Sequence, residues 1–470
     1  MTTTTSLGPA PVEDTGNRWT PMVALMISVT LGILDFFIVN VALPDIQRSF
    51  GASGSAVEWL VAGYGLTFAV FLIAGGRVAD RIGRRRVLAF GIAIFGVASL
   101  LCGIASAAQL LIAARFLQGF GAALVSPTVL SIIGVLYQGT DRRRALGIFG
   151  LVMGLAAVGG QLVGGLLIKA DLFGLGWRTI FLINLPLAAI VLILLPGTVP
   201  ETRSPVRQRV DIVGLVGIAL GLGALLLPLV EGRQQGWPLW SWICLAASVL
   251  IFIGVGVQQS RLGLRGGAAL FPPAAFAARP VRVGLLCMLI YVCNQAPLFL
   301  FLALYLQQGR GMSPIASGLT FSILAGGYLA TSLKAPQLVH RFGRPVVTVS
   351  AALLVIGYLL LGWQLLAHGV GGPVLALAPG LLLVGLGQGI GLNAITTLVL
   401  SGAEPEHVGA VSGVMATVQQ VGSAIGVAVI GLIFFGLADH GLAVALTVTV
   451  LTLAGLMVIM AGLARLLPRP

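Results

Sequence analysis

The stretch GGRVADRIGRRRVL, residues 75–88, places five arginines around a single aspartate between two long apolar runs. Arginines in a short loop between apolar segments are typical of a membrane protein, because they hold that loop on the cytoplasmic side. Arginines alone would be enough for such an anchor. Asp80, which can accept hydrogen bonds from arginine and from a helix N-terminus, indicates a further structural role for the loop.

The composition of the whole chain supports the membrane assignment. Of 470 residues, 58% are hydrophobic and only 9% are charged, whereas soluble proteins carry about 25% charged residues. The ten-residue alternation of a membrane β-barrel is not found. The net charge is +13, and the arginines responsible for it lie mostly in short loops. They are therefore interpreted as residues that orient the protein in the membrane, and no nucleic-acid partner is expected.

Fourteen apolar runs, from 21–43 to 443–466, are long enough to cross a bilayer as helices. Each loop is numbered by the span that precedes it. Seventeen Lys and Arg residues lie in the even-numbered loops and five in the odd-numbered loops. The even-numbered loops are therefore predicted to be cytoplasmic, as are both termini. We expect a multi-pass protein of the inner (plasma) membrane with a disordered cytoplasmic tail at residues 1–20.

Two sequence echoes indicate an internal repeat. LQGFGAALVSPTVL at 117–130 is matched by GQGIGLNAITTLVL at 387–400, and DRIGR at 80–84 by HRFGR at 340–344. Both echoes fall eight spans apart, which a six-helix unit repeated around a two-helix insert would produce. The expected domains are 21–200, an insert at 201–280, and 281–470. Parallel repeats of this kind are typical of transporters that work by alternating access.

At this point the chain resembles the major facilitator superfamily, and more narrowly its fourteen-span drug:proton antiporters. The loop at 75–88 is similar to the signature after span 2. LDFFIVNVALPDI at 34–46 resembles the span 1 motif and RFLQGFGAA at 115–123 the span 4 motif. In span 5, Ala156 and Gln161 replace the usual Gly and Pro. The resemblance implies an all-α integral membrane fold of two six-helix bundles and two inserted central helices.

Asp35 and Arg115 are the candidate proton-coupling pair. A charged Asp at the bilayer centre costs about 2.5–3.5 kcal/mol, so such a residue faces a cavity or a partner. Counted from the predicted span ends, the two residues lie at similar depth in the outer half. Three interpretations stay open: a proton-linked switch, an ion pair that only fixes helix packing, and direct pairing of Asp35 with a cationic substrate.

Amide side chains within the spans are candidates for lining a substrate cavity. Gln118 shares a helix face with Arg115, and Gln388 is its partner in the repeat. The other candidates are Asn40, Gln161 and Asn393. Ordinary hydrogen bonds between helices explain these amides equally well.

Two further sets of residues are candidates for moving parts. The resemblance implies a cytoplasmic gate formed by Gly76, Asp80, Arg81, Gly83 and Arg84, and His340 replaces the acid in the second half. Span 5 carries small residues that allow close helix approach, as a hinge face or as static packing. These are Gly147, Gly150, Gly154, Gly160, Gly164 and Gly165.

The function expected from these observations is proton-coupled export of small amphipathic compounds by a monomer, without metal or cofactor. A major facilitator importer or uniporter is the alternative. An intramembrane enzyme is less favoured because the four histidines lie in loops or at span ends and form no metal or nucleophile pattern. A sensor that does not transport is the remaining possibility.

Overall fold

The computed structural model describes residues 19–204, 211–265, 278–404 and 408–467, and within these ranges all the regular secondary structure is helical. Of the predicted N-terminal tail, residues 1–18 lie outside the described part. Thirteen helices in the described residues are long and apolar enough to cross a membrane. Helix α5 adds a fourteenth span if its two parts, which meet at 41°, are counted together. The predicted all-α membrane fold with fourteen spans is confirmed.

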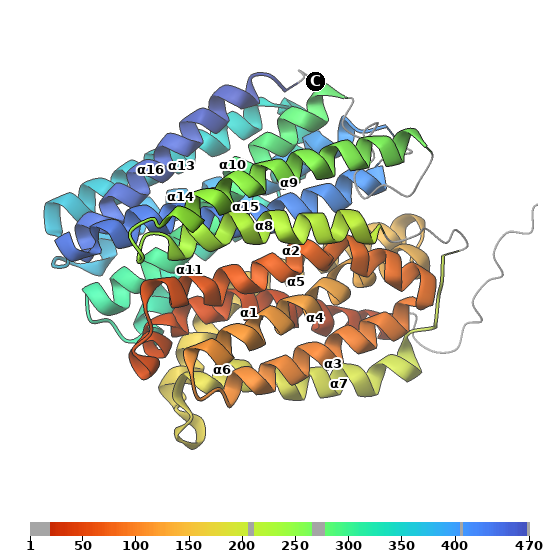
Figure 1. Cartoon of the computed structure of the whole chain (residues 1–470), viewed down its shortest axis with the longest axis horizontal. Helices are drawn as coiled ribbons and strands as arrows, with labels where there is room; N and C mark the ends of the chain where they lie inside the picture. The colour runs from red at the N-terminus through yellow and green to blue at the C-terminus, as the bar shows by residue number, and fades with distance from the viewer. Residues whose placement is uncertain (1–18, 205–210, 266–277, 405–407, 468–470) are drawn as a thin grey trace, which may run out of the picture.

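The helices fall into three groups along the chain (Figure 1). The first group is α1 Thr20–Phe50, α2 Gly54–Ile82, α3 Arg84–Gly103, α4 Ala108–Leu136, α5 Gly139–Ala170, α6 Thr179–Leu182 and α7 Asn184–Thr198. The insert consists of α8 Ile212–Glu231 and α9 Leu239–Leu264. The last group is α10 Arg279–Leu304, α11 Pro314–Ser332, α12 Ala335–Phe342, α13 Pro345–His368, α14 Ala378–Ser401, α15 Val408–Leu437 and α16 Leu442–Ala464.

Short helical turns complete the described chain. They are η1 Leu172–Gly174, η2 Gly176–Arg178, the π-helical η4 Tyr305–Gly309, η5 Val374–Leu377 and η7 Ala438–His440. Polar side chains cap several long helices: Ser53 accepts a hydrogen bond from the Ala56 amide at the start of α2, and Ser313 does so from Ala316 in α11. Such caps satisfy amides that a helix start leaves unpaired.

The two outer groups pack in the same pattern. In the first, α2 and α3 pack on α4, and α1 packs on α5. In the last, α11 and α13 pack on α14, and α10 packs on α15. The halves meet where α2 packs on α15 and α5 on α11, and α8 lies against both α2 and α15. Figure 1 accordingly shows the insert between the N-terminal helices, coloured red to yellow, and the blue C-terminal helices.

The repeat extends to individual contacts. Thr67 Oγ1 of α2 donates to the Phe116 carbonyl of α4 at 2.8 Å, and Thr331 of α11 donates to the Leu386 carbonyl of α14 at 2.9 Å. In each half the glycine three residues beyond that carbonyl, Gly119 or Gly389, lies so close to α2 or α11 that a methyl group would come within 2.3 Å of a backbone oxygen. Small residues are needed where membrane helices approach this closely.

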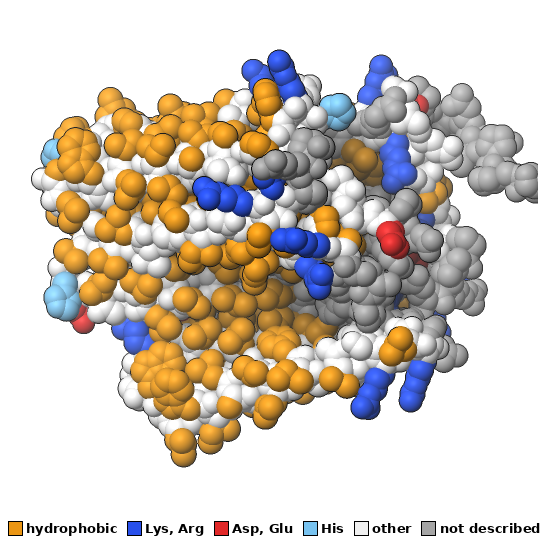
Figure 2. Space-filling model, turned by 90° about the horizontal axis from the view of Figure 1, so that it is seen from above, with side chains coloured by type: hydrophobic (Ala, Val, Ile, Leu, Met, Phe, Trp, Pro, Cys, Tyr) orange, Lys and Arg blue, Asp and Glu red, His pale blue; other side chains and the backbone are white. Residues whose placement is uncertain are grey.

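The surface is divided by chemistry. On the face in Figure 2, hydrophobic side chains dominate the left part, and most Lys and Arg side chains lie in the centre and right. Exposed large hydrophobics occur along the spanning helices, with Phe90, Ile193 and Leu250 as examples, as contact with lipid tails requires. We call the end with the α2–α3 and α4–α5 turns the arginine end, and the end with the α1–α2 and α5–α6 turns the distal end.

Candidate functional site

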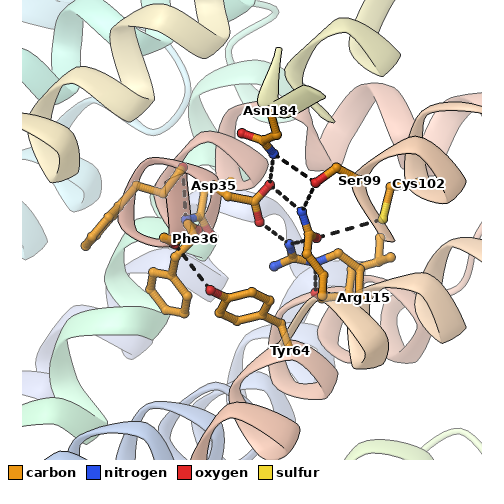
Figure 3. Close-up of polar contacts among 12 residues, drawn as sticks. Asp35, Phe36, Tyr64, Ser99, Cys102, Arg115 and Asn184 are labelled. Atoms are coloured by element: carbon orange, nitrogen blue, oxygen red, sulfur yellow. Dashed lines mark hydrogen bonds and ion pairs between the residues drawn. The ribbon is translucent and has the colours of Figure 1, made fainter. Parts of the chain in front are cut away.

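The first component of the site is a buried polar network in the N-terminal half. Asp35 of α1 is 0% exposed and Arg115 of α4 is 1% exposed. Arg115 Nη1 donates to Asp35 Oδ2, and the other carboxylate oxygen accepts from Gln118 Nε2 and Asn184 Nδ2, each at 2.8 Å (Figure 3). Three helices, α1, α4 and α7, thus converge on one carboxylate.

The guanidinium of Arg115 also bonds to groups other than Asp35. Its Nε donates to the Leu60 carbonyl of α2 at 3.0 Å, and Nη1 also donates to Gln118 Oε1 at 2.7 Å. Ser99 of α3 accepts from Gln118 Nε2 at 2.9 Å. Buried charges are stable only when paired and hydrogen-bonded in this way. The network therefore suits an ionised Asp35, and protonation of its carboxyl group would remove an ionic partner of Arg115.

Helix α1, which carries Asp35, is longer than the apolar run 21–43 predicted from the sequence. Helix α1 continues to Phe50, seven residues past the predicted span end, and Pro44 is accommodated inside the helix. Gly51 ends it in the left-handed conformation at φ 58°, where glycine carries no steric cost. Asp35 consequently lies halfway along α1.

The second component is a cavity of about 580 Å³ between the two halves. Its walls are largely aromatic and amide in character. The aromatic side chains include Phe36, Phe37, Tyr64, Phe68, Phe299, Phe321 and Tyr328, and the amides are Gln161, Gln295, Gln388, Asn393, Gln419 and Gln420. Among the described residues that line it, no Asp, Glu, Lys, Arg or His is present.

The predicted cavity residues divide into two sets. Gln161, Gln388 and Asn393 line the cavity, and both amide atoms of Gln161 and of Gln388 are buried without a hydrogen-bond partner. Gln118 belongs to the Asp35 network instead, and Asn40 donates to the carbonyls of its own helix at Phe36 and Phe37. Neither is among the described lining residues. The spacing of residues along a helix predicts that they share a face, but it does not predict which neighbouring helix or cavity that face contacts.

Tyr64 connects the two components, and the sequence did not single it out. Its ring lines the cavity, while the Arg115 guanidinium lies 4.4 Å from the ring centroid. Its hydroxyl donates to the Gly32 carbonyl of α1 at 3.3 Å. Stacking of a guanidinium on an aromatic face is attractive and depends on the position of both. A molecule that displaces Tyr64 therefore acts directly on Arg115.

The cavity reaches the arginine end and is closed at the distal end. Leu146, Leu72 and Ser332, which lie towards the arginine end of their helices, are part of its lining. At the distal side, Gln307 Nε2 donates to the Val41 carbonyl at 2.8 Å. A methyl group on Gly165 would come within 2.8 Å of Ile315 Cα in the opposite half.

The small residues of α5 therefore have different neighbours. Gly160 and Gly164 lie against α1, where a methyl group would approach Leu34 O and Ile38 Cγ1 to 3.0 Å and 2.7 Å, respectively. Gly165 meets α11. Gly147, Gly150 and Gly154 line the cavity, and a methyl group on Gly147 or Gly150 would have no neighbour within 4 Å.

The predicted gate residues form a compact turn at the arginine end. Arg84 donates to Asp80 Oδ1 through Nε at 3.0 Å and Nη2 at 2.7 Å, and Arg81 is exposed. Gly83 has φ 134° and lies against Glu201, which accepts from the Arg85 amide at 3.1 Å. Gly76 packs near Pro127. This turn is thus bound to the segment after α7 of its own half.

Comparison with known proteins agrees with this architecture. Residues 25–427 match the family model of the Major Facilitator Superfamily. The chain is 36% identical to a probable actinorhodin transporter of Streptomyces coelicolor, over 92% of this chain and 75% of that protein. It is 34% identical to the puromycin resistance protein of Streptomyces alboniger, over 94% and 86%.

A solved structure supports the fold independently. A bacterial homologue of the human lysosomal transporter Spinster, in an inward-facing conformation, superposes with a TM-score of 0.67 at 17% identity, over 96% of this chain and 97% of that one. The resemblance drawn from the sequence motifs is confirmed. The chain is a multi-span membrane protein that belongs to the Major Facilitator Superfamily.

Proposed function

We propose that the chain is a proton-coupled antiporter that exports small, uncharged or weakly charged aromatic compounds across the cytoplasmic membrane. The observation that carries the proposal is the link through Tyr64. This side chain lines the substrate cavity and stacks on the arginine that holds the buried Asp35. Occupation of the cavity and protonation of Asp35 can therefore influence each other.

The lining of the cavity supports the substrate class. Aromatic walls offer stacking surface, and the unpartnered amides of Gln161 and Gln388 offer hydrogen bonds to carbonyl or hydroxyl groups. Pockets with apolar walls and a few polar groups are typical of small-molecule sites. The described lining gives a cationic substrate no carboxylate. Asp35 is not among the described residues that line the cavity, so direct pairing of its carboxylate with a cationic substrate is disfavoured in this conformation.

Alternating access gives the network its role. Here the cavity extends to the arginine end, which the arginine distribution predicts to be cytoplasmic, and Asp35 is paired with Arg115. In an antiporter this is the conformation that has released its proton and accepts substrate. After the cavity opens outward, protonation of Asp35 from outside would weaken its pairing with Arg115 and allow the return. We take 21–200 and 281–470 as the rocking units and 201–280 as the insert.

The remaining predicted residues fit the same cycle. We assign Asp80, Arg84 and their neighbouring glycines to a cytoplasmic gate, which would meet the C-terminal half when the cavity opens outward. Gly160, Gly164 and Gly165 provide the close surface on which α5 moves. One net charge crossing 100 mV provides about 2.3 kcal/mol, equivalent to a gradient of about fifty-fold. The resistance and export roles named for the relatives support export over import.

The test is transport in inside-out membrane vesicles, whose lumen corresponds to the cell exterior. An acidic lumen should drive accumulation of a neutral anthraquinone dye more strongly than that of cationic ethidium. Asp35→Asn should remove the dependence on the pH gradient while the purified protein remains folded. Accumulation that is independent of the gradient in the unaltered protein would contradict antiport.

A further inference from the structure

A second buried carboxyl group lies where the two halves meet at the distal end. Glu58, in the second turn of α2, is 3% exposed, and its Oε2 atom has no hydrogen-bond partner. The Glu58 carboxyl group packs closely against α15, since a methyl group on Gly431 would come within 2.7 Å of the carboxyl carbon of Glu58. The sequence did not single out Glu58.

The charged groups near Glu58 do not neutralise it by direct pairing. Glu231, at the end of α8, adds a second negative charge, and Arg233 of the α8–α9 turn adds a positive one. Each has another partner: Trp59 Nε1 donates to Glu231 Oε1 at 2.9 Å, and Arg233 Nη1 donates to the Phe435 carbonyl at 3.2 Å. Among the described residues, neither cation nor donor lies within bonding distance of Oε2.

The other elements packed on α2 add no closer charge. The described part of α15, from 411 to 437, contains no acidic or basic residue. Arg115 of α4 is committed to Asp35 and to the Leu60 carbonyl. Asp45 of α1 is paired with Arg48. Among the described residues, Arg233 is therefore the one cation that is identified as attracting the Glu58 carboxylate electrostatically.

Burying an ionised carboxylate without a full set of partners is costly, whereas its neutral acid is far more easily accommodated. We propose that Glu58 is a proton-binding site that controls closure of the distal end. When it binds a proton, α2 and α15 can close over it. When it is ionised, hydration of the carboxylate favours separation of α2 from α15, and the nearby charge of Glu231 on α8 makes the buried ionised form less stable still.

This inference rests on the proposed antiport function and on the distal end facing outward. The proton on Glu58 would come from the exterior when the distal end is open and return there when it reopens. A proton that enters and leaves on the same side does no transport work. Glu58 would therefore set how closure depends on external pH, while Asp35 carries the proton that is exchanged for substrate.

The experiment measures the opening of the distal end by pulsed electron spin resonance. Spin labels at the exposed positions Phe173 and Leu375 report the distance between the halves in a full-length protein whose four native cysteines are replaced. We expect the distance to increase between about pH 5 and about pH 9, the range in which buried carboxyls titrate. Glu58→Gln should keep the short distance throughout.

The matched control is Asp439→Asn, which removes an exposed negative charge in η7 at the same end. It should respond to pH as the unaltered protein does. A Glu58→Gln protein whose distance changes with pH as before would overturn the proposal. Gly431→Ala gives a second test, because its methyl group must displace the carboxyl. It should lengthen the distance even at acid pH, and a closed end at every pH would likewise overturn the proposal.

Transport measurements separate this proposal from the function on which it rests. Glu58→Gln should shift the dependence of export on external pH and leave the number of protons exchanged per substrate unchanged. If the unaltered protein shows no gradient-driven accumulation, antiport fails, whereas pH-dependent opening through Glu58 still stands. If accumulation is normal and Glu58→Gln changes neither opening nor pH dependence, the Glu58 proposal alone fails.

Discussion

The two halves place different polar networks at matching positions of the repeat. Asp35 and Asn294 are each the sixteenth residue of their helices, α1 and α10. Asp35 pairs with Arg115, whereas Asn294 accepts from the Tyr358 hydroxyl and donates to the Leu453 carbonyl at 3.3 Å. The scaffold is repeated, but among the described residues the buried charged side chains lie in the N-terminal half.

The repeated glutamines differ in the same way. Gln118 and Gln388 are each the eleventh residue of α4 and α14. Gln118 is saturated by Asp35, Arg115 and Ser99, whereas the Gln388 amide is unpartnered and lines the cavity. This difference supports the proposed roles, in which the N-terminal half holds the coupling pair and Gln388 contributes to substrate contact from the other half.

The largest expected effect comes from removing the cation. Arg115→Met should lower the free energy of unfolding by about 3–5 kcal/mol, because it leaves a buried carboxylate unpaired. Tyr358→Phe, which removes a neutral hydrogen bond from the other half, should cost about 0.5–1.5 kcal/mol. Denaturant unfolding in detergent measures both. Equal losses would remove the distinction between a charged and a neutral half.

The next prediction concerns the scaffold that the halves share. Gly119→Ala and Gly389→Ala should each destabilise by about 1–3 kcal/mol, the usual cost of overpacking, since both methyl groups would collide with a backbone oxygen. Gly150→Ala is the matched control within a helix and should be neutral or stabilising by about 0.5–1 kcal/mol. Very different costs for Gly119 and Gly389 would weaken the structural equivalence.

The two glutamines should separate affinity from coupling. Gln388→Leu removes a hydrogen bond worth about 0.5–1.5 kcal/mol, so dye binding should weaken by roughly two- to ten-fold with the proton gradient still effective. Gln118→Leu should spare the cavity lining and reduce coupling. Binding titrations and vesicle accumulation, measured on both proteins, check this. A Gln118→Leu protein that loses only affinity would contradict the assignment.

The smallest expected effect lies outside both halves. Burial raises the pKa of the Asp211 carboxyl, but hydrogen bonds from the Gly214 amide and from Gln258 and Gln259, with the charge of Arg77, hold the pKa below its ordinary value. The resulting stabilisation is present above the ordinary pKa of about 3.9 and is lost as pH falls through the native value. The melting-temperature difference between the unaltered protein and Asp211→Asn should therefore be larger at neutral pH than below about pH 4.

The architecture was predictable because it depends on segment length and on repeated motifs. Apolar runs fix where helices cross, and the echo of Gln118 in Gln388 fixes the repeat. The Asp35 and Arg115 pairing was anticipated for similar reasons, since two isolated charges in neighbouring spans have few other partners. The end of α1 was not predicted, because the helix extends beyond its apolar run, through Asp45 and Arg48.

The rest of the site depends on how each helix is rotated, which the sequence pattern does not specify. Gln118 was a candidate for the cavity lining, yet it points to Asp35, whereas Ala122, one turn further along α4, lines the cavity. Asn184 and Tyr64 were missed because their roles depend on the neighbouring helices that they contact, Asn184 on Asp35 of α1 and Tyr64 on Arg115 of α4. The motif around Asn184, WRTIFLINLP at 177–186, was the available clue.

Proton release on substrate binding tests the central claim most directly. Purified protein in weakly buffered detergent solution is mixed with the anthraquinone dye at a pH where Asp35 is partly protonated, and a pH indicator follows the bulk. We predict proton release that is lost in Asp35→Asn and retained in Tyr358→Phe. Undiminished release from folded Asp35→Asn protein would show that the N-terminal network is not the site of coupling.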